Sequence, residues 1–248
     1  MDDYDGLVAL VTGGASGIGA SVARLLTSRG ATVAVLDRDL ADPEHAALSI
    51  LCDIGDSAAV DAVVAQVVDT FGRLDVVVNN AGIGAQGDIT ANDDDEWRRV
   101  LDVNVVGMAR VTRAALPHLR RSPAASVVCT SSVVAVVGVP SRALYSASKG
   151  AVLALALAMA ADHVHEGIRV NAVLPGTADT PWVARLLDSA DDPEAARTQL
   201  WDRQPLGRLV SPDEVAHAIA YLGSPLSGST TGTALTVDGG MTGLRLPR

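Results

Sequence analysis

Tyr145 and Lys149 are the side chains in this sequence whose types and spacing point most directly to proton chemistry. They are four residues apart in the predicted helix Ala143–His165, so they lie on one face of it. An ammonium group near a phenol favours the phenolate and lowers the tyrosine pKa from its usual value of about 10. A phenol tuned in this way is a general acid–base catalyst, although the same spacing is common in exposed surface pairs.

Lys149 is the only lysine in a chain that has 18 arginines. An ammonium and a guanidinium differ in size, geometry and the ease with which their pKa shifts. Either Lys149 is kept because it takes part in a reaction, or codon bias and chance explain why it is the only lysine. The position of Ser132 favours a role in a reaction, because Ser132 follows the predicted buried strand Ser126–Ser131. Doubly wound sheets bind ligands at such strand ends, where Ser132 could hold a substrate oxygen beside Tyr145.

A glycine-rich turn, Gly13-Gly14-Ala15-Ser16-Gly17-Ile18-Gly19, follows the predicted strand Leu7–Thr12 and precedes a predicted helix. Its spacing differs from the Gly-x-Gly-x-x-Gly fingerprint of many dinucleotide sites. Glycines let a backbone turn tightly beside a pyrophosphate, and the free N–H groups of a helix N-terminus attract its charge. The turn alone is a weak signal, which its place between a strand and a helix strengthens.

Asp37 ends the second predicted strand, 18 residues beyond Gly19. A carboxylate there accepts hydrogen bonds from an adenosine ribose and repels a 2′-phosphate, which favours NAD over NADP. Arg38 follows directly and could hold a 2′-phosphate instead. Asp53, after the third predicted strand, is placed to reach the adenine.

Strand-like and helix-like segments alternate along the chain, which predicts βαβ units with right-handed crossovers. The expected strands are apolar runs typical of a buried parallel sheet: Leu7–Thr12, Ala31–Asp37, Ala47–Cys52, Leu74–Asn79, Ser126–Ser131, Ile168–Leu174 and Ala234–Val237. The expected helices are Ile18–Arg29, Ser57–Phe71, Asp93–Arg121, Ala143–His165 and Pro212–Leu222. The sequence therefore predicts an α/β fold, a single doubly wound Rossmann-type domain over residues 1–248 with a central, mostly parallel seven-stranded sheet.

The segment at about 176–210 interrupts this alternation. It is long for a loop in a compact domain, it contains several prolines, and it holds two of the three tryptophans. Segments of this kind are often lids or binding segments, so we expect a substrate lid here.

Composition excludes several classes of function. The net charge of −10 disfavours binding to nucleic acid or to an anionic membrane surface. The apolar stretch near 150–161 is too short to span a bilayer and predicts a buried helix. Cys52 and Cys129 lack metal-type spacing, and the N-terminus has no signal-peptide pattern, so we expect reduced thiols, no metal site and a cytoplasmic protein.

Over essentially its full length, the chain resembles the short-chain dehydrogenases/reductases. The matching motifs occur in the right order and spacing: Thr12-Gly13…Gly17-Ile18-Gly19, Asn79-Asn80-Ala81-Gly82, Asn104, Ser132, Tyr145-Ser146-Ala147-Ser148-Lys149, Pro175-Gly176 and Asp238-Gly239-Gly240. The resemblance implies a catalytic set of Asn104, Ser132, Tyr145 and Lys149. In it Tyr145 would exchange the proton, Ser132 would orient the substrate oxygen, and Asn104 would hold a relay water.

The resemblance also implies a cofactor cleft. Its expected residues are Gly13, Ser16, Gly17, Ile18, Gly19, Asp37, Arg38, Asp53, Ile54, Asn80, Ala81, Gly82, Tyr145, Lys149, Pro175, Gly176, Ala178 and Thr180. Ser16 occupies the position where NADPH-dependent members often have an arginine, which again favours NAD. Asn79 would be structural, and tetramers are common in the family, so we expect a homotetramer.

For the substrate, the segment from Thr180 to Arg208 resembles family members that oxidise L-fucose-like sugars or sugar acids. The candidates for substrate contacts are Arg142, Trp182, Arg185, Trp201 and Gln204, with Arg142 placed to meet a carboxylate. Each of them could instead pack within the lid or at a subunit interface.

The leading interpretation is an NAD-dependent sugar or alcohol dehydrogenase acting on a small molecule. One alternative is an NADPH-dependent reductase of 3-ketoacyl or other carbonyl groups, against which Asp37 argues. The other is a non-catalytic dinucleotide-binding sensor, which is hard to reconcile with an intact catalytic set.

Overall fold

The computed structural model describes residues 2–39, 46–188 and 192–246. Parts of the predicted domain 1–248 and of the predicted lid at 176–210, namely residues 1, 40–45, 189–191 and 247–248, lie outside the described residues.

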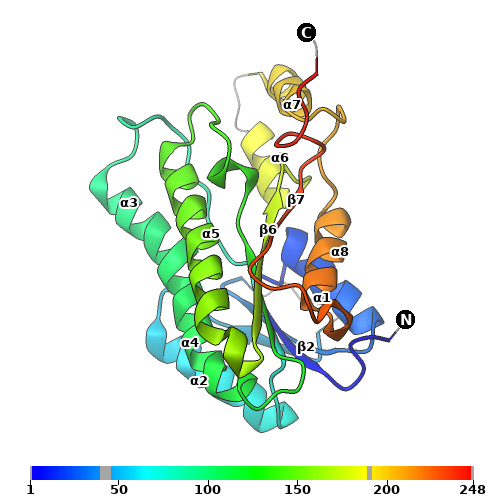
Figure 1. Cartoon of the computed structure of the whole chain (residues 1–248). Coiled ribbons are helices and arrows are strands. Elements are labelled where there is room, and N and C mark those ends of the chain that lie inside the picture. The colour runs from blue at the N-terminus through cyan, green and yellow to red at the C-terminus, as the bar shows by residue number, and fades with distance from the viewer. Residues whose placement is uncertain (1, 40–45, 189–191, 247–248) are drawn as a thin grey trace.

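A parallel sheet forms the centre of the molecule (Figure 1). In the described residues it has seven strands in the order β3-β2-β1-β4-β5-β6-β7. They are β1 (Val8–Thr12), β2 (Thr32–Asp37), β3 (Leu48–Leu51), β4 (Val76–Asn79), β5 (Ser126–Thr130), β6 (Arg169–Pro175) and β7 (Ala234–Val237). Each neighbouring pair is parallel, so the predicted doubly wound fold class is confirmed. The strand order reverses between β1 and β4, which is where such sheets bind ligands.

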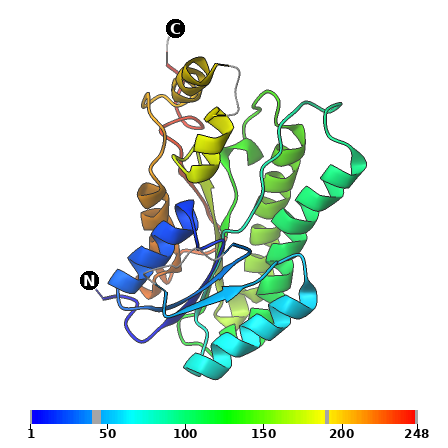
Figure 2. The same ribbon diagram turned by 180° about the vertical axis from the view of Figure 1, so that it is seen from behind.

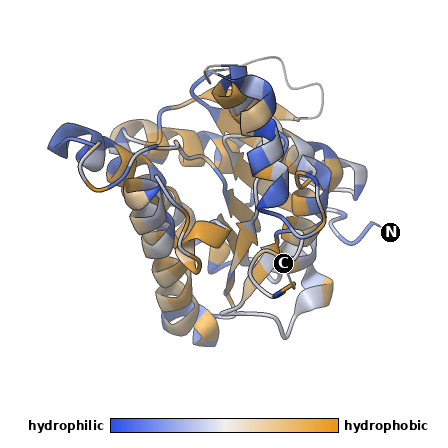
Figure 3. Ribbon diagram, turned by 90° about the horizontal axis from the view of Figure 1, so that it is seen from above, coloured by the Kyte–Doolittle hydropathy of each residue, from blue (hydrophilic) through white to orange (hydrophobic). Residues whose placement is uncertain are grey.

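Helices cover both faces of the sheet. Figures 1 and 2 show α2 (Ser57–Phe71), α4 (Gly107–Leu119) and α5 (Ala143–His163) on one face. On the other face α1 (Gly17–Ser28) lies beside α8 (Pro212–Gly223). Viewed from above in Figure 3, the apolar strands lie enclosed between these layers.

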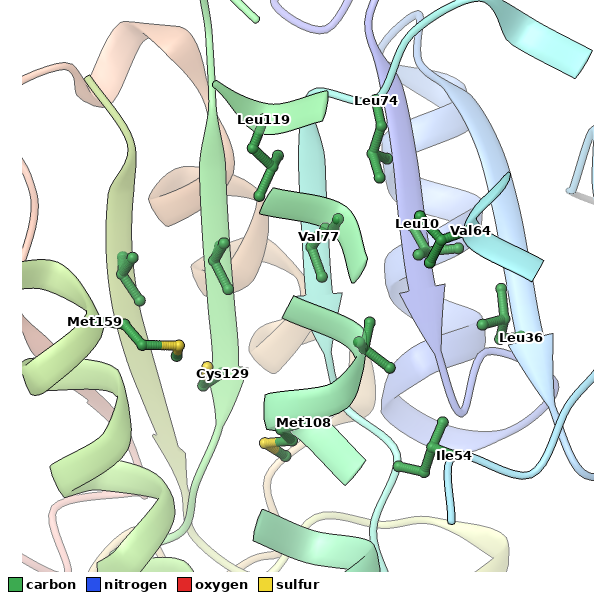
Figure 4. Packing of buried hydrophobic residues seen from close by; sticks show 14 of the residues in the cluster. Leu10, Leu36, Ile54, Val64, Leu74, Val77, Met108, Leu119, Cys129 and Met159 are labelled. Atoms are coloured by element: carbon green, nitrogen blue, oxygen red, sulfur yellow. The ribbon is translucent and has the colours of Figure 1, made fainter. Parts of the chain in front are cut away.

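The core is apolar on both sides of the sheet because alternate strand residues point to opposite faces. Leu10, Leu36 and Val77 pack against α2 and α4 on one side, as Figure 4 shows. Val11 and Val78 pack on the other side, against α1 and α8. This burial fixes the sheet register. The register in turn decides which residues lie together at the carboxyl ends of the strands.

The predicted helix Asp93–Arg121 is interrupted. The structure has α3 (Asp94–Leu101), a π-helical segment (Asp102–Val106) and then α4. A π-helical segment inserts an extra residue into a helical turn and often occurs at functional sites. Here it carries Asn104, which is fully buried.

Two helices that the sequence did not predict lie in the segment at 176–210, α6 (Pro181–Asp188) and α7 (Pro193–Asp202). Both begin with a proline, and Asp192 caps α7 by accepting a hydrogen bond from the N–H of Ala195 at 3.0 Å. These are ordinary helix-start signals, so the sequence did contain them. Figure 1 shows both helices near the top of the molecule, beyond the strand ends.

The stretch Ala143–Glu166, which α5 begins, is long and apolar enough by length and composition to cross a membrane. The sequence prediction of an apolar stretch too short to span is therefore wrong, because the helix extends well beyond 150–161. Leu144, Val152 and Ala156 nevertheless bury one face of α5 within the fold.

Candidate active site

The glycine-rich turn forms a close-packed cradle at the N-terminus of α1. Gly13 has a φ of +65°, and a Cβ on it would lie 2.9 Å from the Cα of Ala81. A Cβ on Gly19 would lie 2.0 Å from the carbonyl oxygen of Gly13. Side chains are therefore excluded at both positions, and the turn packs closely enough for Ser16, Gly17 and Ile18 at the start of α1 to line a hollow that could take an anion.

Thr12 and Asn80 join this cradle to the end of β4. The hydroxyl of Thr12 accepts hydrogen bonds from the N–H groups of Asn80 and Ala81, both at 3.0 Å. The Asn80 amide donates to the carbonyl oxygens of Thr12 and Gly13, both at 3.2 Å. Asn79 points away from the cleft and donates to the hydroxyl of Thr112 at 2.8 Å, consistent with a structural role.

A hollow of about 270 Å³ opens beside the cradle. Asp37 lies on its wall and accepts hydrogen bonds from the N–H groups of Ala15 at 3.0 Å and Asp39 at 3.1 Å. The predicted cofactor residues that line this hollow are Gly13, Ser16, Gly17, Ile18, Asp37, Arg38, Asp53, Ile54, Asn80, Ala81, Gly82 and Thr180. An accessible helix N-terminus and a carboxylate at the wall suit the pyrophosphate and the ribose of a dinucleotide.

A second cavity, of about 230 Å³, continues from the first. Ile18, Asn80, Gly82, Ile83, Thr180 and Trp182 line both. Ser132, Tyr145 and Lys149 line only the second, together with Pro175, Gly176 and Ala178. The structure therefore brings the predicted proton-transfer residues to the inner end of the predicted cofactor cleft, and their roles stay predictions.

Lys149 is anchored at the floor of this cavity. Its ammonium donates a hydrogen bond to the carbonyl oxygen of Thr130 at 2.9 Å and lies 5.7 Å from the centroid of the Tyr145 ring. The hydroxyl of Ser131 donates to the carbonyl oxygen of Lys149 at 2.7 Å, which ties the end of β5 to α5. The only lysine in the chain is thus buried beside the tyrosine with which it was predicted to act.

The predicted lowering of the Tyr145 pKa is wrong for the protein alone. Burial raises the pKa of Tyr145 to about 12, although the charge of Arg142 and the hydrogen bond to Ser132 act against this rise. Burial also lowers the pKa of Lys149 to about 8. Both shifts have one physical cause, since burial destabilises phenolate and ammonium alike.

Asn104 links the π-helical segment to α5 and to the loop after β4. Its side chain accepts a hydrogen bond from the N–H of Ile83 at 2.7 Å and donates to the carbonyl oxygen of Ile83 at 2.9 Å. It also donates to the hydroxyl of Ser148 at 3.0 Å. These bonds fix α5 against the loop after β4, so Asn104 holds the two walls of the cavity together.

A strap formed by Thr180, Pro181 and Trp182 crosses the junction of the two cavities. A Cβ on Gly17 would lie 3.2 Å from Cγ2 of Thr180, so the strap touches the glycine-rich turn. A Cβ on Gly84 would lie 2.2 Å from Cζ2 of Trp182. The indole therefore lies against the Gly84 backbone and covers the cleft.

The five predicted substrate residues separate into three groups. Arg142 and Trp182 line the second cavity, whereas Arg185 lines an outer groove beside Gln86 and Glu96. Trp201 is 42% exposed and is not among the cavity residues.

Gln204 is buried away from the cavity, and its amide donates to the carbonyl oxygens of Thr177 at 3.3 Å and Arg208 at 2.9 Å. Its predicted contact with substrate is corrected to a backbone-holding role, because these bonds occupy the amide nitrogen. Sequence reasoning missed Arg203, which does line the cavity and comes directly after α7.

Comparisons with known proteins extend over nearly the whole chain. A family model described as enoyl-(acyl carrier protein) reductase matches residues 13–242. Cis-4-hydroxycyclohexanecarboxylate dehydrogenase of Sinomonas cyclohexanicum is 42% identical over 245 residues, which cover 95% of this chain and 96% of that protein. L-fucose dehydrogenase of Bos taurus is 38% identical, covering 96% and 90%. The solved structure of ligand-free aldohexose dehydrogenase from Thermoplasma acidophilum has a TM-score of 0.91 at 34% identity and covers 100% of this chain and 99% of that chain.

Proposed function

Since the chain belongs to the short-chain dehydrogenase/reductase family, an oxidoreductase family that binds nicotinamide dinucleotides, we propose that it oxidises a small secondary alcohol reversibly with NAD. We further propose that the alcohol is a sugar or a sugar acid. The observation that carries the reaction class is the convergence of Ser132, Tyr145 and Lys149 on a cavity continuous with the glycine-rich cradle.

The residues present fit a dinucleotide, because Gly13 and Gly19 let the turn pack tightly against its neighbours and the start of α1 lines the first hollow. The N-terminus of α1 would hold the pyrophosphate, and Asp37 would hold the adenosine ribose. A 2′-phosphate would meet the Asp37 carboxylate, which is the basis for proposing NAD rather than NADP. When bound, the nicotinamide supplies the acceptor for the hydride.

The side chains of the cavity accept and return the hydroxyl proton of the substrate. In the oxidising direction the phenolate of Tyr145 takes the hydroxyl proton of the substrate as the C–H hydride leaves the same carbinol. Ser132 orients the substrate oxygen, and the ammonium of Lys149 stabilises the phenolate by its charge. In the reducing direction Tyr145 returns this proton to the oxygen.

The sugar or sugar-acid assignment draws on the relatives named for L-fucose and aldohexoses. We also propose a cytoplasmic homotetramer, since tetramers are common in the family. The net charge of −10 disfavours nucleic acid and anionic membrane surfaces as partners.

The test is NADH production by the purified protein over deoxyhexoses, pentoses, sugar acids and simple secondary alcohols, with NADP⁺ run in parallel. Turnover of sugars or sugar acids with NAD⁺ is the expected result. A further arm follows NADPH oxidation with a ketoacyl thioester, and activity in that arm alone would favour the reductase alternative. Cofactor binding without turnover of any alcohol would favour a dinucleotide-binding sensor.

A further inference from the structure

The cavity that holds Tyr145 has an unusual charge balance for this chain. The protein carries 29 acidic and 19 basic residues. Three cationic side chains, Arg142, Lys149 and Arg203, nevertheless line the cavity, and no carboxylate among the described residues does so. Lys149 has a defined partner in the carbonyl oxygen of Thr130 at 2.9 Å, so the two arginines are the charges left to explain.

Arginines of similar burial elsewhere in the described part of the molecule have carboxylate or carbonyl partners. In the part of the chain that the structure describes, the partly buried arginines are Arg29, Arg110, Arg142, Arg169 and Arg203. Arg29 and Arg110 form bidentate ion pairs with carboxylates, and the Arg169 guanidinium donates to four carbonyl oxygens.

Arg142 and Arg203 differ from these three. Arg142 donates only to the adjacent carbonyl oxygen of Ser141, at 3.4 Å, and no described carboxylate pairs with Arg203. Burial and the positive charge of Arg203 both lower the pKa of Arg142. Two guanidiniums that repel each other in a cavity are unfavourable unless an anion lies between them.

The two arginines stand at the outer end of the cavity. Arg142 precedes α5, three residues before Tyr145. Arg203 follows α7, in the lid segment at 176–210. Both also line a neighbouring surface hollow, together with Gln86 and Gln199. They therefore form the mouth of a cavity whose inner end holds Ser132 and Tyr145. Aliphatic side chains such as Leu186 and Leu200 line both hollows, and they strengthen charge–charge attraction by excluding water.

We propose that Arg142 and Arg203 form a receptor for the carboxylate of the substrate, so that the enzyme acts on hydroxy acids in preference to neutral sugars. The planar guanidinium fork matches a carboxylate bidentately. A hydroxy acid spanning the cavity places its carbinol at Tyr145 and its carboxylate at the mouth. This inference rests on the proposed dehydrogenase function and narrows its substrate class.

Binding without turnover tests the receptor independently of catalysis. The probes are cyclohexanecarboxylate, its neutral analogue cyclohexanecarboxamide, and cyclohexylphosphonate, each titrated into the protein saturated with NADH. We expect the carboxylate to bind at least about tenfold tighter than the amide, as is typical for a charged hydrogen-bonded pair. Equal binding of carboxylate and amide overturns the receptor, and tighter binding of the phosphonate overturns the assignment to a carboxylate.

Arg203→Gln is the sharper variant, because the charge of Arg142 also lowers the Tyr145 pKa and its removal would disturb catalysis directly. Arg203→Gln should abolish most of the preference for carboxylate over amide, and Arg203→Lys should restore part of it. Arg197→Gln is the matched control, since Arg197 is exposed on α7, the helix that Arg203 directly follows. An unchanged preference in Arg203→Gln overturns the proposal.

Kinetics with NAD⁺ separates this inference from the function on which it rests. Matched pairs are galacturonate with galactose and 4-hydroxycyclohexanecarboxylate with 4-methylcyclohexanol. A higher kcat/KM for the acid of a pair supports the receptor. Turnover of the neutral members with no preference for the acids overturns the receptor alone, whereas no turnover of any alcohol overturns the dehydrogenase function itself.

Discussion

At the scale of single residues, the proton chemistry depends on the phenol of Tyr145. Tyr145→Phe removes the hydroxyl but preserves the ring that fills the cavity wall. We expect kcat/KM for alcohol oxidation to fall about 10²–10⁴-fold, the usual contribution of a general base, while the Kd for NADH stays within about twofold. Steady-state kinetics and NADH fluorescence titration measure the two effects. Tyr221→Phe on α8 is the control, and wild-type turnover in Tyr145→Phe would exclude the assignment.

The same residue predicts a pH dependence. Burial raises the Tyr145 pKa to about 12 in the protein without cofactor, so the phenol is protonated at neutral pH. Oxidation needs the phenolate, and we therefore expect its kcat/KM to rise as pH increases above 7. Reduction needs the protonated form and should be insensitive below about pH 8, above which the Lys149 ammonium that stabilises the phenolate is lost. Initial rates in both directions from pH 6 to 10 decide this, and an oxidation rate that falls with rising pH would contradict it.

Asp37 should control the choice of cofactor. In Asp37→Ser the carboxylate that would repel a 2′-phosphate is removed, so we expect the kcat/KM ratio of NAD⁺ to NADP⁺ to fall about tenfold or more. The loss of the bond to the Ala15 N–H adds a small decrease in activity with both cofactors. Asp61→Asn, on the exposed face of α2, is the control. A wild-type ratio in Asp37→Ser would refute the carboxylate argument.

The residues that the sequence could predict are those whose chemistry is visible in their type, such as Tyr145, Lys149 and Asp37. Arg203 could not be found in this way, because it reaches the cavity only when α7 packs over the strand ends. The prediction of a lowered pKa for Tyr145 was wrong for a related reason. Spacing shows that Lys149 is near, but only the packed cavity shows how strongly burial opposes the charge.

At the scale of elements, the strands and most helices could be predicted from the sequence. The strands are apolar runs, and most of the helices repeat apolar residues with the helical period. The sequence could not predict the π-helical segment at Asp102–Val106, because Asn104 gains its bonds to Ile83 and Ser148 from distant parts of the chain. That tertiary network compensates a local geometry that sequence propensity disfavours.

The start of α8 carries a prediction about stability. Glu214 accepts hydrogen bonds from the Arg208 guanidinium at 2.7 and 2.9 Å and from the N–H of Ser211 at 2.7 Å, completing a capping box. These bonds lower the pKa of Glu214 to about 2. The folded-state pKa lies below the unfolded value of about 4.3, so this stabilisation is present above pH 4.3 and is lost as pH falls towards 2.

Glu214→Gln should therefore lower the free energy of unfolding at pH 7 by about 0.5–1 kcal/mol, a small value because the pair is partly exposed. The difference from wild type should shrink as pH falls from 4 to 3. Urea denaturation at pH 7, 4 and 3 measures it, with Glu194→Gln on α7 as a control whose effect should not follow this course. A difference that grows at low pH would contradict the assignment.

At the scale of the whole molecule, the doubly wound topology was predictable because apolar strands alternating with helices leave few alternatives. The roof of the site was not, since the start of α6 is placed by contacts with Gly17 and the Gly84 backbone, and α7 packs against α6. Neither contact has a signature in local sequence. The same limit applies to surfaces that only a second copy of the chain would cover.

The outward face of α5 is such a surface and carries the last prediction. Leu157 is 43% exposed there, and the small alanines around it would let a second helix approach closely. We expect light scattering to give a mass about four times the 25.4 kDa of one chain. Leu157→Glu would bury a charge in that interface and should reduce the mass, whereas Ile89→Glu, at a side chain 71% exposed elsewhere, should not. A monomer in the wild type would refute the tetramer. An intact tetramer in Leu157→Glu would place the interface away from α5, and Tyr145 and Lys149 would then belong to a helix that assembly does not hold in place.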